Sequence, residues 1–119
     1  MFLGQPVPTV AAPTVVIRPS RILIFPPTKF IDGSAIPAGY VAGAKIYWSN
    51  TSKVYSYTNS KDLGINYFSV TIGTTIPLTS GIWYFVVTVY DSAGNESIAS
   101  NEVAGNLSPA MSYPSISIT

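Results

Sequence analysis

The side chains with the clearest capacity for acid–base chemistry are five carboxylates, because the chain contains no histidine and no cysteine. They are Asp32, Asp62, Asp91, Glu96 and Glu102. Two carboxylates held ~5–9 Å apart in a cleft can hydrolyse a glycosidic bond. However, Asp91 and Glu96 flank one predicted turn and Glu102 opens a predicted strand, which favours structural hydrogen bonding over catalysis. The sequence therefore predicts a protein that is not an enzyme.

The same turn offers oxygen ligands for a calcium ion from Asp91, Asn95 and Glu96. Their spacing does not match that of a calcium-binding loop, and a capped hairpin accounts for all three residues. The lack of histidine and cysteine excludes thiolate chemistry and most zinc sites. We therefore expect no metal, no cofactor and no catalytic residues.

Aromatic residues are the stronger candidates for binding, since they make up 13% of the chain and include eight tyrosines. Strand alternation predicts that five of them share the outer face of one sheet. These five are Tyr47, Tyr55, Tyr57, Tyr84 and Tyr90. Such a face can form a protein interface, where tyrosine is enriched, or can stack on sugar rings. The alternative is that tyrosine is here simply a good strand former.

The rest of the sequence predicts an all-β fold. Short runs rich in Val, Ile, Thr and Tyr are separated by ten prolines and nine glycines, and helical periodicity is absent. We expect strands at 14–18, 21–25, 43–49, 53–58, 67–72, 82–90 and 97–104. Seven short strands predict two packed antiparallel sheets, an immunoglobulin-like sandwich. Both faces of the sixth run are apolar, so that strand should be central, with its second face partly covered.

The turn after this sixth run has the sequence Asp-Ser-Ala-Gly-Asn-Glu at residues 91–96. Asp91 can accept hydrogen bonds from the backbone N–H groups that follow it. We expect Gly94 and Asn95 to supply the positive φ values that a tight connection needs.

Several segments resemble a known family. LTSGIWYFVVTVYDSAGNES at 78–97, followed by SNEV at 100–103, resembles the last third of a bacterial or viral fibronectin type III domain. FPPT at 25–28 and VAGAKIYWS at 41–49 are similar to the end of that family's second strand and to its third strand. The resemblance covers residues 13–104. It implies a seven-stranded sandwich used for spacing, adhesion or assembly, without catalytic residues.

The segments outside the resemblance, 1–12 and 105–119, are predicted to be extended arms. Pro6 and Pro8 favour an extended backbone, and the tail ends in an alternating Ile-Ser-Ile. We predict that the arms bind neighbouring subunits by adding to their sheet edges. The residues expected to make these contacts are Phe2, Leu3, Val7, Val10, Met111, Tyr113, Ile116 and Ile118.

The charge content limits the possible partners. Charged residues make up 9% of the chain, the net charge is +1 and the basic residues are dispersed, which argues against nucleic-acid binding. No apolar run approaches the ~18 residues of a membrane helix. The N-terminal stretch has no basic start and is interrupted by prolines, so it does not resemble a signal peptide, and we expect synthesis in the host cytoplasm.

These features lead to a hypothesis about function. We expect a non-enzymatic virion protein of a tailed or other bacteriophage, which decorates the capsid or joins the neck, tail or fibre. It would be homo- or hetero-oligomeric with other virion structural proteins. The alternative is a carbohydrate-binding or host-adhesion module that binds host-surface glycans through the tyrosine face. A third hypothesis is an extracellular spacer from a larger secreted glycosidase.

Overall fold

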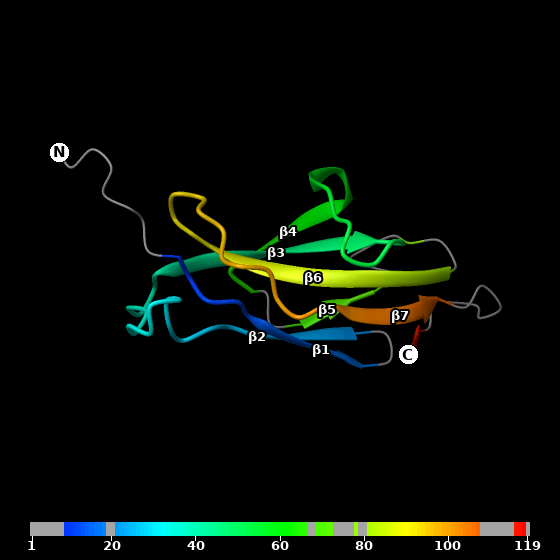
Figure 1. Ribbon diagram of the computed structural model, residues 1–119, viewed down its shortest axis with the longest axis horizontal. Coiled ribbons are helices and arrows are strands. Elements are labelled where there is room, and N and C mark those ends of the chain that lie inside the picture. The colour runs from blue at the N-terminus through cyan, green and yellow to red at the C-terminus, as the bar shows by residue number, and fades with distance from the viewer. Residues whose placement is uncertain are drawn as a thin grey trace.

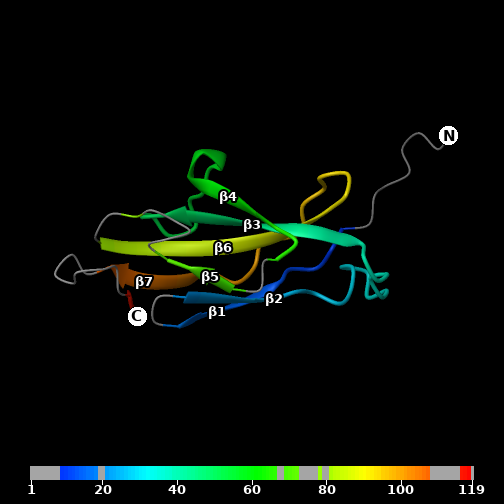
Figure 2. The same ribbon diagram turned by 180° about the vertical axis from the view of Figure 1, so that it is seen from behind.

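The structure, a computed structural model, describes residues 9–18, 21–66, 69–72, 78, 81–107 and 116–118. These residues form two antiparallel sheets stacked face to face (Figures 1 and 2). The three-stranded sheet has the order β1-β2-β5, with β1 at Thr14–Arg18, β2 at Arg21–Phe25 and β5 at Ser69–Thr71. The five-stranded sheet has the order β4-β3-β6-β7-β8. Its strands are β3 at Val41–Ser49, β4 at Ser60–Gly64, β6 at Gly81–Asp91, β7 at Val103–Leu107 and β8 at Ile116–Ile118.

The core lies between the two sheets because alternate residues of each strand point inward. The inward residues of the strands are Val15, Ile17, Ile22, Ile24, Ala44, Ile46, Val70, Phe85, Val87 and Val89. The central position predicted for the sixth strand is confirmed, since β6 pairs with β3 on one side and β7 on the other. Val86 and Thr88, on its opposite face, are also buried. Other segments of the chain must therefore cover this outer face of β6 as well.

The all-β prediction is confirmed, and the strands predicted at 14–18 and 21–25 have those bounds in the structure. The strand predicted at 53–58 is wrong. This segment is a loop that ends in a short 3-10 helix, η1 at Tyr57–Asn59, and β4 follows it. Lys53 has a φ of 65°, and the Ser56 hydroxyl accepts a hydrogen bond from the Thr58 N–H at 3.2 Å. Such local bonds compete with the strand ladder.

The strand predicted at 97–104 begins only at Val103. The residues before it still run beside β6, but two serine hydroxyls replace backbone carbonyls as acceptors. Ser97 Oγ accepts from the Val89 N–H at 3.0 Å, and Ser100 Oγ accepts from the Val87 N–H at 2.9 Å. Both buried β6 amides are thereby satisfied without a regular ladder. The strand predicted at 67–72 corresponds to β5 at Ser69–Thr71, which ends one residue earlier than expected; residues 67 and 68 lie outside the described part.

The predicted N-terminal arm is corrected at Val10, which is a buried member of the domain's own core. Val10 forms a β-bridge with Phe30, and the carbonyl of Thr9 accepts from the Ile31 N–H at 2.9 Å. The segment that follows the β6 turn also contacts Val10, since the Ile98 N–H donates a hydrogen bond to the Val10 carbonyl at 3.3 Å. Val10 is therefore not free to bind a neighbour. Three other arm residues, Phe2, Leu3 and Val7, lie outside the described residues.

The predicted C-terminal tail is corrected as well. Residues 105–107 belong to β7, and Ile116 to Ile118 pair antiparallel with them as β8. The backbone at Ile116 and Ile118 therefore adds to this chain's own sheet edge instead of a neighbour's. Met111 and Tyr113 lie outside the described residues. Within those residues, the structure has no helix that is both long and apolar enough to cross a membrane.

Candidate functional site

A concavity lies on the outer face of the five-stranded sheet. It has a volume of about 370 Å³ and opens to solvent. We call it the tyrosine hollow. Its lining residues are Tyr47, Tyr55, Ser56, Tyr57, Val86, Thr88, Glu96, Ser97 and Ala99.

Two strands form the floor of the hollow, and two loops form its walls. Tyr47 of β3 and Val86 and Thr88 of β6 point outward from the sheet, because their neighbours in each strand point into the core. The loop 50–59 rises beside them from β3, and the segment 96–99 runs along β6 on the side away from β3 (Figure 1). These two loops are what buries the outer face of β6.

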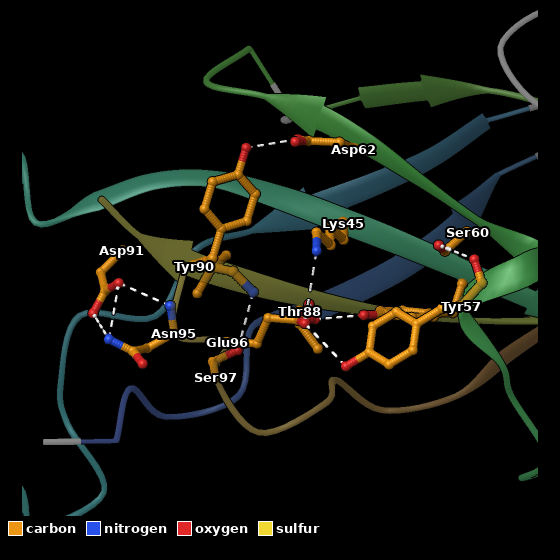
Figure 3. Close-up of polar contacts among 12 residues, drawn as sticks. Lys45, Tyr57, Ser60, Asp62, Thr88, Tyr90, Asp91, Asn95, Glu96 and Ser97 are labelled. Atoms are coloured by element: carbon orange, nitrogen blue, oxygen red, sulfur yellow. Dashed lines mark hydrogen bonds and ion pairs between the residues drawn. The ribbon is translucent and has the colours of Figure 1, made fainter. Parts of the chain in front are cut away.

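Glu96 is the centre of the polar contacts in the hollow (Figure 3). Its Oε1 accepts hydrogen bonds from the Tyr47 hydroxyl at 2.5 Å and the Thr88 hydroxyl at 2.7 Å. Its Oε2 lies 3.4 Å from the Tyr57 hydroxyl and 3.8 Å from Lys45 Nζ. The carboxylate therefore links β3, β6 and the loop 50–59.

The electrostatics follow from these contacts. Burial acts to raise the pKa of Glu96, but the hydroxyls of Tyr47 and Thr88 and the Lys45 ammonium outweigh it and lower the pKa from its ordinary value. Burial, and then the hydrogen bond to Glu96, raise the pKa of Tyr47. At neutral pH the pair is thus a charged carboxylate and a neutral phenol, which suits a charge-assisted hydrogen bond.

A second carboxylate, Glu102, fixes the loop that walls the hollow. It accepts hydrogen bonds from the Ser52 hydroxyl at 2.6 Å, from the Lys53 N–H at 2.8 Å and from the Tyr55 hydroxyl. Burial, followed by the hydrogen bond to Glu102, raises the pKa of Tyr55. Three donors from one loop thus bond to one carboxylate that directly precedes β7, and these bonds hold the loop against the sheet.

The structure brings Tyr47, Tyr55 and Tyr57 together in the hollow, although Tyr55 and Tyr57 come from a loop and not from the predicted strand. Tyr84 and Tyr90 lie on the same outer face of β6 but outside the hollow. The Tyr90 hydroxyl donates to Asp62 at 2.6 Å, as Figure 3 shows. The expected tyrosine face is therefore split: three tyrosines line the hollow, Tyr90 lies beside β4, and Tyr84 lies toward the start of β6, where it pairs with Ser49 and Ala104.

The turn after β6 is capped as the sequence suggests. Asp91 Oδ1 accepts from the N–H groups of Ala93 at 3.0 Å and Asn95 at 2.9 Å, and Gly94 has a φ of 87°. The positive φ expected for Asn95 is wrong, since Lys53 is the described non-glycine residue with positive φ. Glu96 points away from this cap, toward Thr88. Among the described residues, no group of three or more acidic side chains could hold a metal ion.

The sequence did not indicate the roles of two residues that shape this region. Glu96 was expected to belong to a turn, and no sequence signal indicated that its side chain bonds to residues of two strands. The other residue is Asn101, whose amide donates to the Val15 carbonyl at 2.9 Å and accepts from the Val15 N–H at 2.9 Å. Asn101 thereby acts as a one-residue strand partner for β1. The SNEV segment that carried the family resemblance contained this residue.

Comparisons with protein-family models, with curated proteins and with solved structures found no match to this chain.

Proposed function

We propose that this protein is a non-enzymatic adhesion module with a fibronectin type III-like sandwich, which binds a host-surface component through the tyrosine hollow. The observation that carries the proposal is the hollow itself. An open concavity of about 370 Å³ is lined by three tyrosines and one charged carboxylate. Binding pockets are typically concave and aromatic with a few polar groups, and their volumes begin at about 300 Å³.

The strand order bears on the family part of the proposal. In the immunoglobulin constant arrangement the fourth strand joins the first, second and fifth strands. Here β4 pairs with β3 instead, which leaves β1, β2 and β5 as a three-stranded sheet. The sandwich therefore differs from the constant immunoglobulin arrangement, and the fibronectin type III type is proposed from the resemblance of residues 13–104.

The carboxylates support a non-enzymatic role. The pKa is lowered in all five acidic side chains, so each is charged at neutral pH. A general acid needs the opposite, a pKa raised toward the working pH. The sparse charge of the chain, 9% of its residues, suits a protein packed among other subunits, and we propose that a virus particle carries it.

The test compares three proteins: the natural chain, Tyr57→Ala and Phe25→Ala. Tyr57 and Phe25 are both exposed aromatic residues, at 72% and 52% exposure, but Phe25 ends β2 in the other sheet. Each protein is incubated with cell-envelope preparations from a panel of bacteria, and co-sedimentation is measured. Loss of envelope binding in Tyr57→Ala but not in Phe25→Ala is the expected result. Equal binding by all three proteins would refute a role for the hollow.

A second candidate function is assembly with other virion subunits through a sheet edge. The observation that favours it is β8, which adds three residues to the β7 edge through backbone pairing. A strand that pairs within one chain can pair with a neighbouring copy in the same register. Oligomers of the full chain that are lost after truncation at Leu107 would support this function. A full chain that stays monomeric at all concentrations would exclude this route.

A further inference from the structure

One oxygen of Glu96 has spare capacity for a ligand. Oε1 already accepts two short hydrogen bonds, from Tyr47 and Thr88. Oε2 has a hydroxyl at 3.4 Å and an ammonium at 3.8 Å, and these distances exceed the ~2.5–3.0 Å of a good bond from an O–H donor and the ~2.7–3.2 Å of one from an N–H donor. A carboxylate oxygen can accept two such bonds. Oε2 can therefore accept a hydroxyl from a bound molecule.

An aromatic surface lies beside this oxygen. Tyr57 is 72% exposed, and its ring meets that of Tyr47 at an angle of 65° with 5.7 Å between the centroids. The edge contact fixes the Tyr57 ring without covering it. Its exposed surface can pack against an apolar face of a ligand.

The charges around the hollow select among possible ligands. Lys45 Nζ lies 5.8 Å from the centroid of the Tyr57 ring and 5.9 Å from that of Tyr90. The protein's own ammonium thus already occupies the position that these rings would offer a foreign cation, and it would repel one. An anion would be repelled in turn by the charged Glu96 carboxylate. Neither sign is favoured, which leaves neutral ligands that carry hydroxyl groups.

We propose that the tyrosine hollow binds a neutral pyranose sugar, whose C–H face packs on the Tyr57 ring while one hydroxyl donates to Glu96 Oε2. The Lys45 ammonium, whose side chain is 32% exposed, donates to a second sugar oxygen. The open shape of the hollow fits the end or the edge of a longer glycan. This inference rests on the proposed function, because it names the chemical class of the host-surface component.

The test is an NMR titration of the ¹⁵N-labelled full chain. The probes are glucose, galactose, mannose and N-acetylglucosamine, each with a disaccharide of the same sugar. At least one probe should produce saturable shifts of the backbone amides of Ser56, Tyr57, Glu96 and Ala99. Tyr57→Ala should weaken the affinity about tenfold, which corresponds to about 1.4 kcal/mol. Phe25→Ala is the matched control and should leave the affinity unchanged.

Two charged analogues test the selection by charge. Glucuronate and glucosamine should bind more weakly than the neutral sugar that binds best, by repulsion from Glu96 and Lys45 respectively. Tighter binding of either charged sugar would overturn the assignment to neutral ligands. Saturable shifts confined to the three-stranded sheet would overturn the assignment to the hollow.

The outcome also separates this inference from the proposed function. Envelope binding that depends on Tyr57, without any response to the neutral sugars, would overturn the sugar assignment and leave the adhesion function standing. In that case the hollow would bind a protein of the envelope. Envelope binding that does not depend on Tyr57, together with silent titrations, would refute both.

Discussion

Glu96 is the residue on which the geometry of the hollow depends most, so its replacement gives the sharpest test of stability. Glu96→Ala removes the acceptor of the Tyr47 and Thr88 hydroxyls, which donate at 2.5 and 2.7 Å. A hydrogen bond to a charged group contributes about 1.5–3 kcal/mol. Because the open hollow lets water replace part of each bond, we expect a total loss of about 2–3 kcal/mol. The contact with Lys45 at 3.8 Å should add less than about 1 kcal/mol.

Glu96→Gln separates the charge of this side chain from its shape. An amide oxygen can still accept from both hydroxyls, so the expected loss in the free energy of unfolding is smaller, about 1 kcal/mol. The assay is urea unfolding followed by tryptophan fluorescence, with the free energy and the m-value fitted for each variant. Ile98→Ala, an exposed change in the same connection after β6, is the control and should stay within about 0.5 kcal/mol of the natural chain. A Glu96→Ala variant equally close to the natural chain would refute this account of the hollow.

Three further predictions concern the frame around the hollow. Asn101→Ala should lower the free energy of unfolding by about 1–2 kcal/mol in urea, because the buried Val15 N–H and carbonyl lose the amide that bonds both; an unchanged value would contradict its role as a strand partner. The pKa of every acidic side chain is lowered on folding, so these groups stabilise the folded protein above the unfolded pKa near ~4, and this stabilisation is lost as the pH falls through the lower folded values. The melting temperature should therefore decrease as the pH is lowered below about 4. A melting temperature that increases in this pH range would contradict the assigned pKa directions. Gly43→Ala should destabilise the protein by about 1–3 kcal/mol, because the added methyl would overlap the Tyr90 ring and lie 2.9 Å from the Gly64 carbonyl oxygen; a variant as stable as the natural chain would show that the ring moves freely.

The sequence was sufficient for the layers of the fold and for its central strand. Alternation along 82–90 predicted that Tyr84 and Tyr90 share the outer face of β6, because each residue of a strand faces opposite to its neighbours, which here enter the core. The Asp91 cap was also predictable, since an aspartate bonds locally to the amides that follow it. Both features depend on interactions within a few residues.

The features that failed depend on contacts between distant parts of the chain. The segment 53–58 has the composition of a strand, but Glu102, about fifty positions away, binds three donors of the loop 50–59 and fixes the segment as a loop against the sheet. The arm at Val10 resembled a free ribbon because its partners, Phe30 and Ile98, are remote in sequence. Tyr55 and Tyr57 still meet Tyr47, but through this loop.

The most direct measurement of the central claim is the reactivity of Tyr57 toward tetranitromethane, mapped by mass spectrometry, with and without the envelope preparation that the protein binds. In the free protein Tyr57 should be nitrated and Tyr47 spared, since their exposures are 72% and 8%. In the complex Tyr57 should become protected, because the ligand covers its ring. A Tyr57 that reacts equally fast in the complex would contradict the claim that the hollow is the binding surface.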